Sequence, residues 1–487
     1  MPETTPTPFE ELGKPRLPGA PPDPYSPRGF PQAQRTLMPW QRYALIGAVV
    51  LLAAAAFVSW RIELLVINIV LSVFYLVTTV YRYWLIDLSM RQARDLRFTP
   101  EQLAHPPAAA EQWPTYVVLV PLYHEADVLP RLVAGLSRLD YPKDRLEIRL
   151  LVEADDDETM AAARALDLRP PFVIWPIPVS QPRTKPKACN VGLQNCNAQL
   201  LVIYDAEDQP EPDQLKKAAW AFASVSRHVA CIQAKLNFYN SRRNFLTRCF
   251  TAEYATWFDL CLPGLDRLQA PIPLGGTSNH FRVAVLKDLG GWDEFNVTED
   301  CDLGIRLFAE GWQTRILDST TWEQACPDLR YWIRQRSRWV KGYIQTYLIH
   351  NRAPLRLLRR MGFTHALHFH LLVGGTPLCQ LISPLYWFLA VLWLVARPQG
   401  LSEFFPGPIF AMGALCLFVG NFIFAYTAAI ACVRRGFGDL AKHGLLMPIY
   451  WVLMSLGAWR GLVQLLLNPH HWDKTAHFAD PQATASG

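Results

Sequence analysis

The sequence predicts an α/β globular domain embedded in an α-helical transmembrane region. Apolar residues gather in two blocks near the ends of the chain, while the middle alternates short β-branched runs with helical patterns. Apolar stretches of about 20 residues can cross a bilayer core roughly 30 Å thick. Alternating strands and helices are typical of βαβ units on a mainly parallel sheet.

The first apolar block predicts a transmembrane hairpin at 41–86. Its two arms, 43–60 and 64–83, are separated only by Arg61, Ile62 and Glu63. Arginines flank the outer ends of both arms, and such residues are enriched on the cytosolic side of membranes. We therefore expect both ends in the cytosol, with residues 1–40 forming a disordered, Pro-rich cytosolic tail.

The second block predicts interfacial and transmembrane helices over 348–467. It contains three apolar stretches, at about 371–395, 409–431 and 445–467. Three full crossings would put the tail at 468–487 outside the cell. Arg460 and Gln464 favour instead a last stretch that lies in the interface or re-enters. Both positions of the tail stay open.

Composition excludes one class of partner. The net charge is only +5 and the basic residues are scattered, which does not indicate nucleic-acid binding. The 10 cysteines show no paired spacing and indicate reduced thiols.

Polar residues follow two of the strands expected in the globular domain, which we place at 95–347. These residues, after strands at 116–120 and 148–152, are Pro121, Tyr123, Glu125, Glu153 and Asp155. Ligands of doubly wound sheets bind at the carboxyl ends of strands, so this group predicts contacts to a nucleobase or ribose. A purely structural acidic turn is the alternative.

A basic and an acidic segment flank a third expected strand, at 200–204. Lys187 and Asn190 precede it, and such residues can neutralise a diphosphate and orient a hydroxyl group. The carboxylates that follow it are Asp205, Glu207 and Asp208. Carboxylates bind Mg²⁺ or Mn²⁺ together with substrate phosphate oxygens. A solvated basic loop and an acidic helix cap are the alternatives.

Two further motifs carry acid–base and sugar-binding groups. Glu299 and Asp300 open a predicted helix after Thr298, and a carboxylate can take the proton of an attacking hydroxyl. A basic helix at about 328–347 carries Gln335, Arg336, Arg338 and Trp339, which suit phosphates and a sugar ring. Thr298 could cap the first helix, and a capping role for the whole acidic group is the alternative there. A membrane-surface role is the alternative for the second helix.

In this order, and between membrane segments, these motifs resemble processive family 2 glycosyltransferases such as bacterial cellulose synthase and hyaluronan synthase. The Thr-Glu-Asp motif at 298–300 and the Gln-x-x-Arg-Trp motif at 335–339 are the specific part of the resemblance, which covers about 115–347. The chain is similar to the cellulose-synthase-like enzymes of bacterial exopolysaccharide and biofilm-matrix synthesis. It shares with them Asp-Ala-Glu-Asp-Gln-Pro at 205–210, Gly-Gly-Thr-Ser-Asn-His-Phe-Arg at 275–282, and Trp-x-Lys-Thr at 472–475.

The resemblance implies a GT-A fold and inverting, metal-dependent transfer from a UDP-sugar. It implies Asp300 as general base beside Glu299, and a metal held by Asp205 and Glu207 with Asp208 as a rival ligand. The implied donor-binding residues are Pro121, Tyr123, Glu125, Glu153, Asp155, Lys187, Asn190, Asp205, Glu207, Gln335, Arg336 and Arg338. The implied acceptor-binding residues are Trp339, Gly276, Thr277 and Asp302. A cytosolic lid would contain Trp472, Lys474 and Thr475.

The chain departs from the family pattern at two points. The usual Asp-x-Asp is Asp205-x-Glu207 here, and Glu153 stands where an Asp is usual. We expect a multi-pass enzyme of the bacterial inner membrane, with a cytosolic catalytic domain and Mg²⁺ or Mn²⁺ as cofactor. It would bind a nucleotide-sugar donor and a saccharide acceptor, extend a β-linked polysaccharide, and pass it across the membrane with accessory export subunits. Single-sugar transfer to a lipid and a non-catalytic membrane scaffold are the alternatives.

Overall fold

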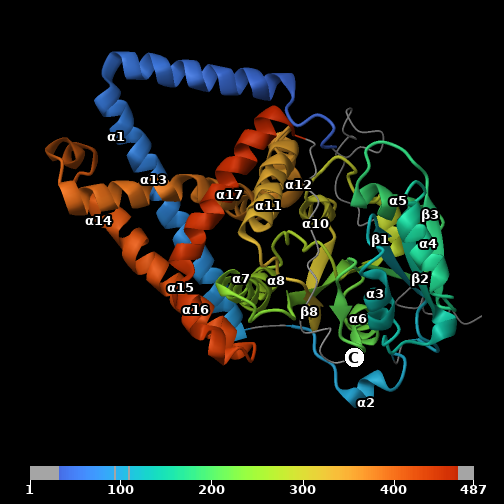
Figure 1. The fold of residues 1–487 in the computed structure, drawn as a ribbon. Coiled ribbons are helices and arrows are strands. Elements are labelled where there is room, and N and C mark those ends of the chain that lie inside the picture. Colours follow the sequence, from blue (N-terminus) through green and yellow to red (C-terminus); the bar gives the residue numbers. More distant parts are fainter. Residues whose placement is uncertain (1–31, 93–94, 108–109, 470–487) are drawn as a thin grey trace, which may run out of the picture.

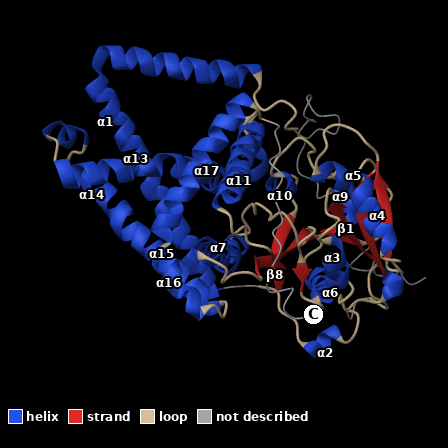
Figure 2. Cartoon of the chain, in the orientation of Figure 1, coloured by secondary structure: helices blue, strands red, loops and turns tan. Residues whose placement is uncertain are grey.

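A sheet-containing domain lies beside a group of long helices (Figure 1). The computed structural model describes residues 32–92, 95–107 and 110–469. Strands occupy only one side of the molecule, and the other side is helical (Figure 2). The α/β class embedded in a helical region is therefore confirmed.

One eight-stranded mixed sheet organises the domain, in the order β3-β2-β1-β4-β7-β6-β8-β5. Strand β7 runs antiparallel to β4 and β6, and β5 runs antiparallel to β8, while the remaining neighbours are parallel. The strands are β1 Tyr116–Leu122, β2 Leu146–Glu153, β3 Phe172–Ile177, β4 Leu200–Ile203, β5 Gln209–Pro210, β6 Val229–Phe238, β7 Asn279–Arg282 and β8 Gln313–Glu323.

Helices cover both faces of this sheet, which explains why its central strands are apolar throughout. In β1, Val118 and Val120 pack with α3 and α6, whereas Val117 and Leu119 pack in a second core with α5 and α9. Successive side chains of a strand point to opposite faces, so one apolar run supplies both cores.

Seventeen α-helices occur in the described part of the chain. They are α1 Pro39–Gln92, α2 Pro100–Leu103, α3 Leu129–Leu136, α4 Asp157–Ala165, α5 Lys185–Gln194, α6 Gln214–Ser224, α7 Phe245–Thr256, α8 Leu262–Arg267, α9 Val283–Asp288, α10 Glu299–Ala309, α11 Leu329–His350, α12 Pro354–Phe369, α13 Gly375–Ala396, α14 Gly407–Ala414, α15 Asn421–Arg434, α16 Ala441–Leu445 and α17 Met447–Leu467.

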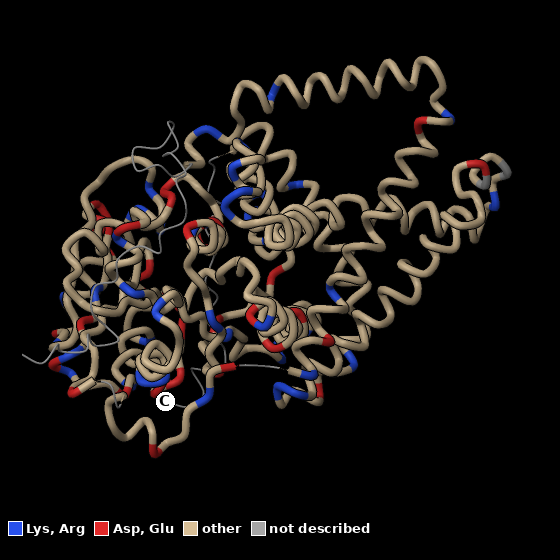
Figure 3. Tube along the Cα trace, turned by 180° about the vertical axis from the view of Figure 1, so that it is seen from behind, with Lys and Arg blue, Asp and Glu red and all other residues tan. Residues whose placement is uncertain are grey.

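Four helical segments are long and apolar enough to cross a membrane, by length and composition, in the described residues: Pro39–Gln92, Pro354–Ala396, Gly407–Arg434 and Met447–Leu467. Acidic and basic side chains concentrate in the sheet domain and near helix ends, leaving the long helices almost without charge (Figure 3).

Helix α1 contains both arms of the predicted hairpin. It bends at Ser59, where φ is −161° and ψ is 89°, and Arg61 beyond the bend pairs with Glu403 at 3.4 Å. Most side chains between 43 and 58 are exposed. The two arms are therefore joined by a bend within the helix and not by a loop. That both ends of the hairpin lie in the cytosol stays a prediction.

Helix α17 lies against α11, the helix that carries the Gln-x-x-Arg-Trp motif. Two glycines permit this approach: a Cβ on Gly461 would lie 2.6 Å from the Ser337 carbonyl oxygen, and one on Gly457 would lie 2.9 Å from Arg336 Cβ. The apolar helix α17 therefore helps to fix the position of the motif helix α11.

Candidate functional site

The carboxyl ends of β1, β2, β4 and β8 open into one cavity of about 680 Å³, which helices α7, α10 and α11 complete. Side chains that are far apart along the chain meet in this cavity, because the carboxyl ends of parallel strands lie at one edge of a sheet. The predicted residues that line it are Pro121, Tyr123, Glu125, Glu153, Asp205, Glu207, Gly276, Glu299, Asp300, Gln335, Arg336, Arg338 and Trp339.

Lys185 links the acidic turn after β4 to the Gly276 loop. Its ammonium group pairs with Asp205 and donates to the Gly276 carbonyl oxygen at 2.7 Å. Burial alone would lower the pKa of Lys185, but the carboxylates of Asp205 and Glu299 outweigh it and raise the pKa. Lys185 is therefore a fixed positive charge at the wall of the cavity.

Four carboxylates crowd the region around this turn. Burial, followed by repulsion from Asp205 and Glu207, raises the pKa of Asp208 well above its usual range. Burial also raises the pKa of Glu323 well above its usual range, and repulsion from Asp208, Glu207 and Asp205 adds to the rise. Excess negative charge of this kind favours a bound cation.

The residues present fit a divalent metal that takes part of its coordination shell from a substrate. Asp205 and Glu207 face the cavity, and oxygen ligands suit Mg²⁺ and Mn²⁺. Asp208 is 1% exposed and accepts from the Asp205 amide at 2.7 Å and from the Thr277 hydroxyl. Its Oδ1 atom is buried without a hydrogen-bond partner in the described structure. No group of three or more His, Cys, Asp or Glu side chains in the described ranges is placed to hold a metal alone.

Glu299 and Asp300 form the first turn of α10 at the wall of the cavity. Asp300 Oδ1 accepts from the Cys301 amide at 2.8 Å, and Oδ2 lies 3.5 Å from where a Cβ on Gly276 would stand. Burial raises the pKa of Asp300, although the Cys301 amide, Lys185 and Arg338 oppose the rise. Burial and repulsion from Asp300 raise the pKa of Glu299 to about 7. A carboxylate whose pKa is about 7, as that of Glu299 is, can exchange a proton near neutral pH.

Thr298 packs α10 against α11 instead of capping it. The Thr298 side chain makes no cap hydrogen bond, so the expectation that Thr298 caps this helix is wrong. The Thr298 backbone N–H donates to the side-chain oxygen of Asn296 at 3.0 Å. A Cβ on Gly342 of α11 would lie 2.4 Å from the Thr298 side chain, so only glycine fits there. This contact brings the two motifs together.

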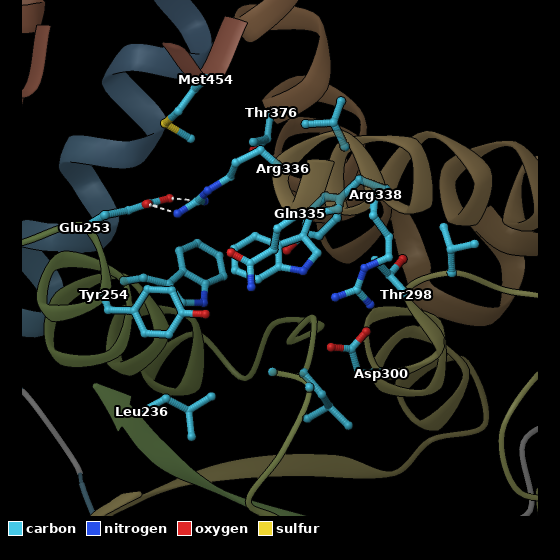
Figure 4. A pocket seen from close by; sticks show the side chains of 18 of the residues that line it. Leu236, Glu253, Tyr254, Thr298, Asp300, Gln335, Arg336, Arg338, Thr376 and Met454 are labelled. Atoms are coloured by element: carbon cyan, nitrogen blue, oxygen red, sulfur yellow. Dashed lines mark hydrogen bonds and ion pairs between the residues drawn. The ribbon is translucent and has the colours of Figure 1, made fainter. Parts of the chain in front are cut away.

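Helix α11 contributes Gln335, Arg338 and Trp339, among other residues, to the lining of the cavity. Figure 4 shows Arg338 next to Asp300, Tyr254 on the opposite side of the view, and Gln335 between them. The Trp339 ring lies 6.4 Å from that of Tyr254, centroid to centroid. Flat aromatic faces beside a cation can hold a sugar ring and a phosphate together.

Arg336 borders the cavity but is held by another partner. Its Nη1 donates to Glu253 Oε1 at 2.7 Å, and its Nη2 donates to Glu253 Oε2 and, at 2.8 Å, to the Tyr450 hydroxyl. The predicted donor contact of Arg336 therefore competes with a buried ion pair between α7, α11 and α17.

Several predicted residues lie outside the cavity lining. Lys187 is buried against Glu153, with Nζ 2.9 and 3.0 Å from the two carboxylate oxygens. Asn190 donates to the Trp292 carbonyl oxygen at 2.9 Å and to Glu294 at 3.0 Å. Asp155 pairs with Arg183 at 2.5 Å. These side chains support the walls of the site.

The predicted acceptor residue Asp302 also points away from the cavity. It is fully buried and binds Arg306 at 2.7 Å and His350 at 2.9 Å. Thr277 is buried and donates to the Ile203 carbonyl oxygen at 3.0 Å. The expected lid residues Trp472, Lys474 and Thr475 lie outside the described residues.

Sequence reasoning missed two acidic residues of the cavity, Glu253 and Glu323. Glu323 ends β8, so its position after a strand was a usable signal. Glu253 lies in the middle of α7, and nothing local distinguishes it from a solvent-facing helix residue.

Residues 114–342 match the family model described as "Glycosyltransferase like family 2". These residues form a family 2 glycosyltransferase domain.

Two of three curated relatives carry names that refer to different products, a glucomannan and a glycosylated diacylglycerol. The chain is 27% identical to "Probable glycosyltransferase YdaM" of Bacillus subtilis, over 48% of this chain and 56% of that protein. It is 25% identical to "Glucomannan 4-beta-mannosyltransferase 2" of Arabidopsis thaliana, over 52% and 46%. It is 27% identical to "Beta-monoglucosyldiacylglycerol synthase" of Synechocystis, over 58% and 60%. The chain thus spans about half the length of the curated relatives it matches.

A solved structure shares the fold of the glycosyltransferase domain. It is the mannosyltransferase PcManGT from Pyrobaculum calidifontis in complex with GDP-Man and Mn²⁺, with a TM-score of 0.50 and 18% identity over 83% of this chain and 99% of that chain. The expected GT-A fold with a mixed sheet is confirmed.

Proposed function

We propose that the chain is a membrane-bound, inverting glycosyltransferase that extends a β-linked polysaccharide from a nucleotide-diphosphate sugar and passes the product across the membrane. One observation carries this proposal. The cavity that holds Asp205 and Asp300 is also lined by Thr78, Gln380 and Ser383 of the long apolar helices α1 and α13.

The donor diphosphate would lie between Lys185, Arg338 and the acidic turn. Asp205 and Glu207 would hold Mg²⁺ or Mn²⁺, which supplies positive charge to the leaving diphosphate. Arg338 can bind phosphate oxygens through charge-assisted hydrogen bonds. A UDP-sugar is the donor class that the sequence resemblance supports.

Asp300 would accept the proton of the acceptor hydroxyl. The new bond joins that oxygen to the anomeric carbon, and the bond from this carbon to the diphosphate oxygen breaks with its electron pair. Trp339 would hold the acceptor ring while Asp300 takes the proton. Attack opposite the leaving group inverts the anomeric carbon, so an α-linked donor yields a β-linked product.

A donor screen with purified protein tests the proposal. UDP-glucose, UDP-N-acetylglucosamine and GDP-mannose are each supplied with Mn²⁺, and release of nucleoside diphosphate and the size of the product are measured. Sugar transfer from one donor into a chain of many units supports the proposal. Absence of transfer with every nucleotide sugar tested would remove it in favour of a scaffold.

Transfer of one sugar to a lipid is the second candidate. The membrane part of the cavity also carries apolar side chains, among them Phe424, Trp451 and Met454, which suit acyl chains. A product that extracts into organic solvent with the mass of a single added hexose would favour this candidate over a polymer.

A further inference from the structure

A row of polar side chains joins the second arm of α1 to α13 inside the membrane helices. Arg82 Nη2 donates to Thr376 Oγ1 at 2.9 Å, and Thr78 Oγ1 lies 3.4 Å from Cys379 Sγ. Farther from the catalytic domain, Ser72 Oγ lies 3.3 Å from the Tyr386 hydroxyl. We call these residues, together with Asn68, the polar seam.

Asn68 ends the polar seam. The Tyr386 hydroxyl donates to Asn68 Oδ1 at 2.8 Å, and Asn68 Nδ2 donates to the Phe404 carbonyl oxygen at 2.6 Å. At 1.5 Å per residue, the helix from Arg82 to Asn68 spans about 21 Å, which is most of a bilayer core of roughly 30 Å.

The α1 side of the polar seam follows from the sequence. The members of the polar seam on α1 (Asn68, Ser72, Thr78 and Arg82), together with Tyr75, are spaced three or four residues apart. This spacing puts them on one face of a helix. Polar residues are expensive in membrane helices and are commonly functional.

The polar seam is open at one end and closed at the other. Thr78, Arg82 and Thr376 line the large cavity that reaches the catalytic carboxylates. Tyr75 and Ser383 line both this cavity and a second one of about 20 Å³, which Ser72 and Tyr386 also line. The second space holds about one water molecule and is far too small for a sugar ring.

We propose that Asn68, Ser72 and Tyr386 form a binding site for the hydroxyl groups of an uncharged saccharide, and that they close this site by hydrogen-bonding one another when no saccharide occupies it. The proposal rests on the proposed function, since single-sugar transfer to a lipid needs no site at this depth.

The chemistry of the three side chains supports this assignment. An amide and two hydroxyl groups offer both donors and acceptors, as sugar hydroxyls do, and none of the three carries a charge. Interhelical hydrogen bonds in membranes are weak, so an entering saccharide can replace them. The only charged member of the polar seam, Arg82, lies at the end near the catalytic domain.

A leak measurement on reconstituted protein tests the closed state. Tyr386→Ala removes the side chain that bonds both Asn68 and Ser72, so vesicles holding this variant should leak iodide about tenfold faster than wild-type vesicles. Tyr426→Ala is the matched control, because Tyr426 is 54% exposed on α15. Equal leak from the Tyr386 variant and this control overturns the proposal.

Tyr386→Phe tests the site without a large change in shape. It keeps the ring and removes the hydroxyl, so the average product should shorten several-fold in a donor assay with wild-type protein alongside. Product of wild-type length from both Tyr386→Phe and Asn68→Leu contradicts a saccharide site. Failure of the wild-type protein to transfer sugar counts against the proposed function, whereas transfer by wild type with no effect of these variants counts against this inference alone.

Discussion

The Arg336 guanidinium group and the Glu253 carboxylate form a two-pronged ion pair, with Nη1 and Oε1 2.7 Å apart, that ties α11 to α7 (Figure 4). The Tyr450 hydroxyl completes it from α17, donating to Glu253 Oε2 at 2.7 Å. Helices α7, α11 and α17 therefore share one polar contact at the wall of the cavity.

Glu253→Ala should destabilise the protein strongly. It leaves the buried charge of Arg336 without its partner, and breaking such a pair costs about 3–5 kcal/mol. Tyr450→Phe removes only one hydroxyl and should cost about 1 kcal/mol. Thermal unfolding in detergent compares the two, and equal midpoints would show that the ion pair does not hold the helices.

Asp300→Asn should lower kcat at least about 100-fold, because the amide is nearly isosteric but cannot take a proton. Binding of a nucleoside diphosphate with Mn²⁺, measured by calorimetry, should change little. In the wild type, burial raises the pKa of Asp300, so activity should fall on the acid side as this carboxylate becomes protonated. Wild-type turnover in the variant would exclude Asp300 as the base.

The contribution of Glu299 to the free energy of unfolding should decrease as the pH rises from 4.5 to about 7. Its folded-state pKa is about 7 against an ordinary 4.5, so the folded state holds this proton more tightly than the unfolded state. The favourable contribution is complete below pH 4.5 and is lost as the pH rises to about 7. The unfolding midpoint of Glu299→Gln, relative to wild type, should therefore increase across this range. A difference that stays constant across this range would contradict the prediction.

Asp205→Ala should weaken Mn²⁺-dependent binding of a nucleoside diphosphate about tenfold, and more than Glu207→Ala does, because Asp205 lies nearer the end of β4 and pairs with Lys185. Removal of divalent metal with a chelator should abolish the difference between the variants. If a calorimetric titration shows that both variants lose the same affinity for the nucleoside diphosphate, the predicted greater effect of Asp205→Ala is wrong.

Asp302→Ala should act on stability rather than on acceptor binding. Asp302 is fully buried between Arg306 and His350, so its loss leaves a buried cation unpaired at a cost of about 3–5 kcal/mol. A lowered unfolding midpoint with an unchanged acceptor KM is expected. An unchanged midpoint with a raised acceptor KM would instead support the acceptor contact that the sequence predicts.

Much of the site could be predicted from local patterns. Asp205 and Glu153 come at the ends of apolar strands, so the sequence alone predicts that they lie at one edge of a sheet. Asp300 and Gln335 belong to recognisable motifs in predicted helices. The predictions for Lys187, Asn190 and Asp302 assigned ligand contacts to side chains that the structure pairs with protein groups. A motif specifies residue type and backbone position, but the direction of a side chain depends on neighbours elsewhere in the chain.

The sequence by itself determined the order of elements, the apolar helices and the strand ends that carry carboxylates, because hydrophobic periodicity and turn chemistry act over a few residues. Only the tertiary structure decided that Arg336 pairs with Glu253, 83 residues away, and that Ser72 meets Tyr386, 314 residues away. It also placed the bend of α1 at Ser59. These features depend on how helices pack, and packing is set by complementary shapes and buried charges that no single segment contains.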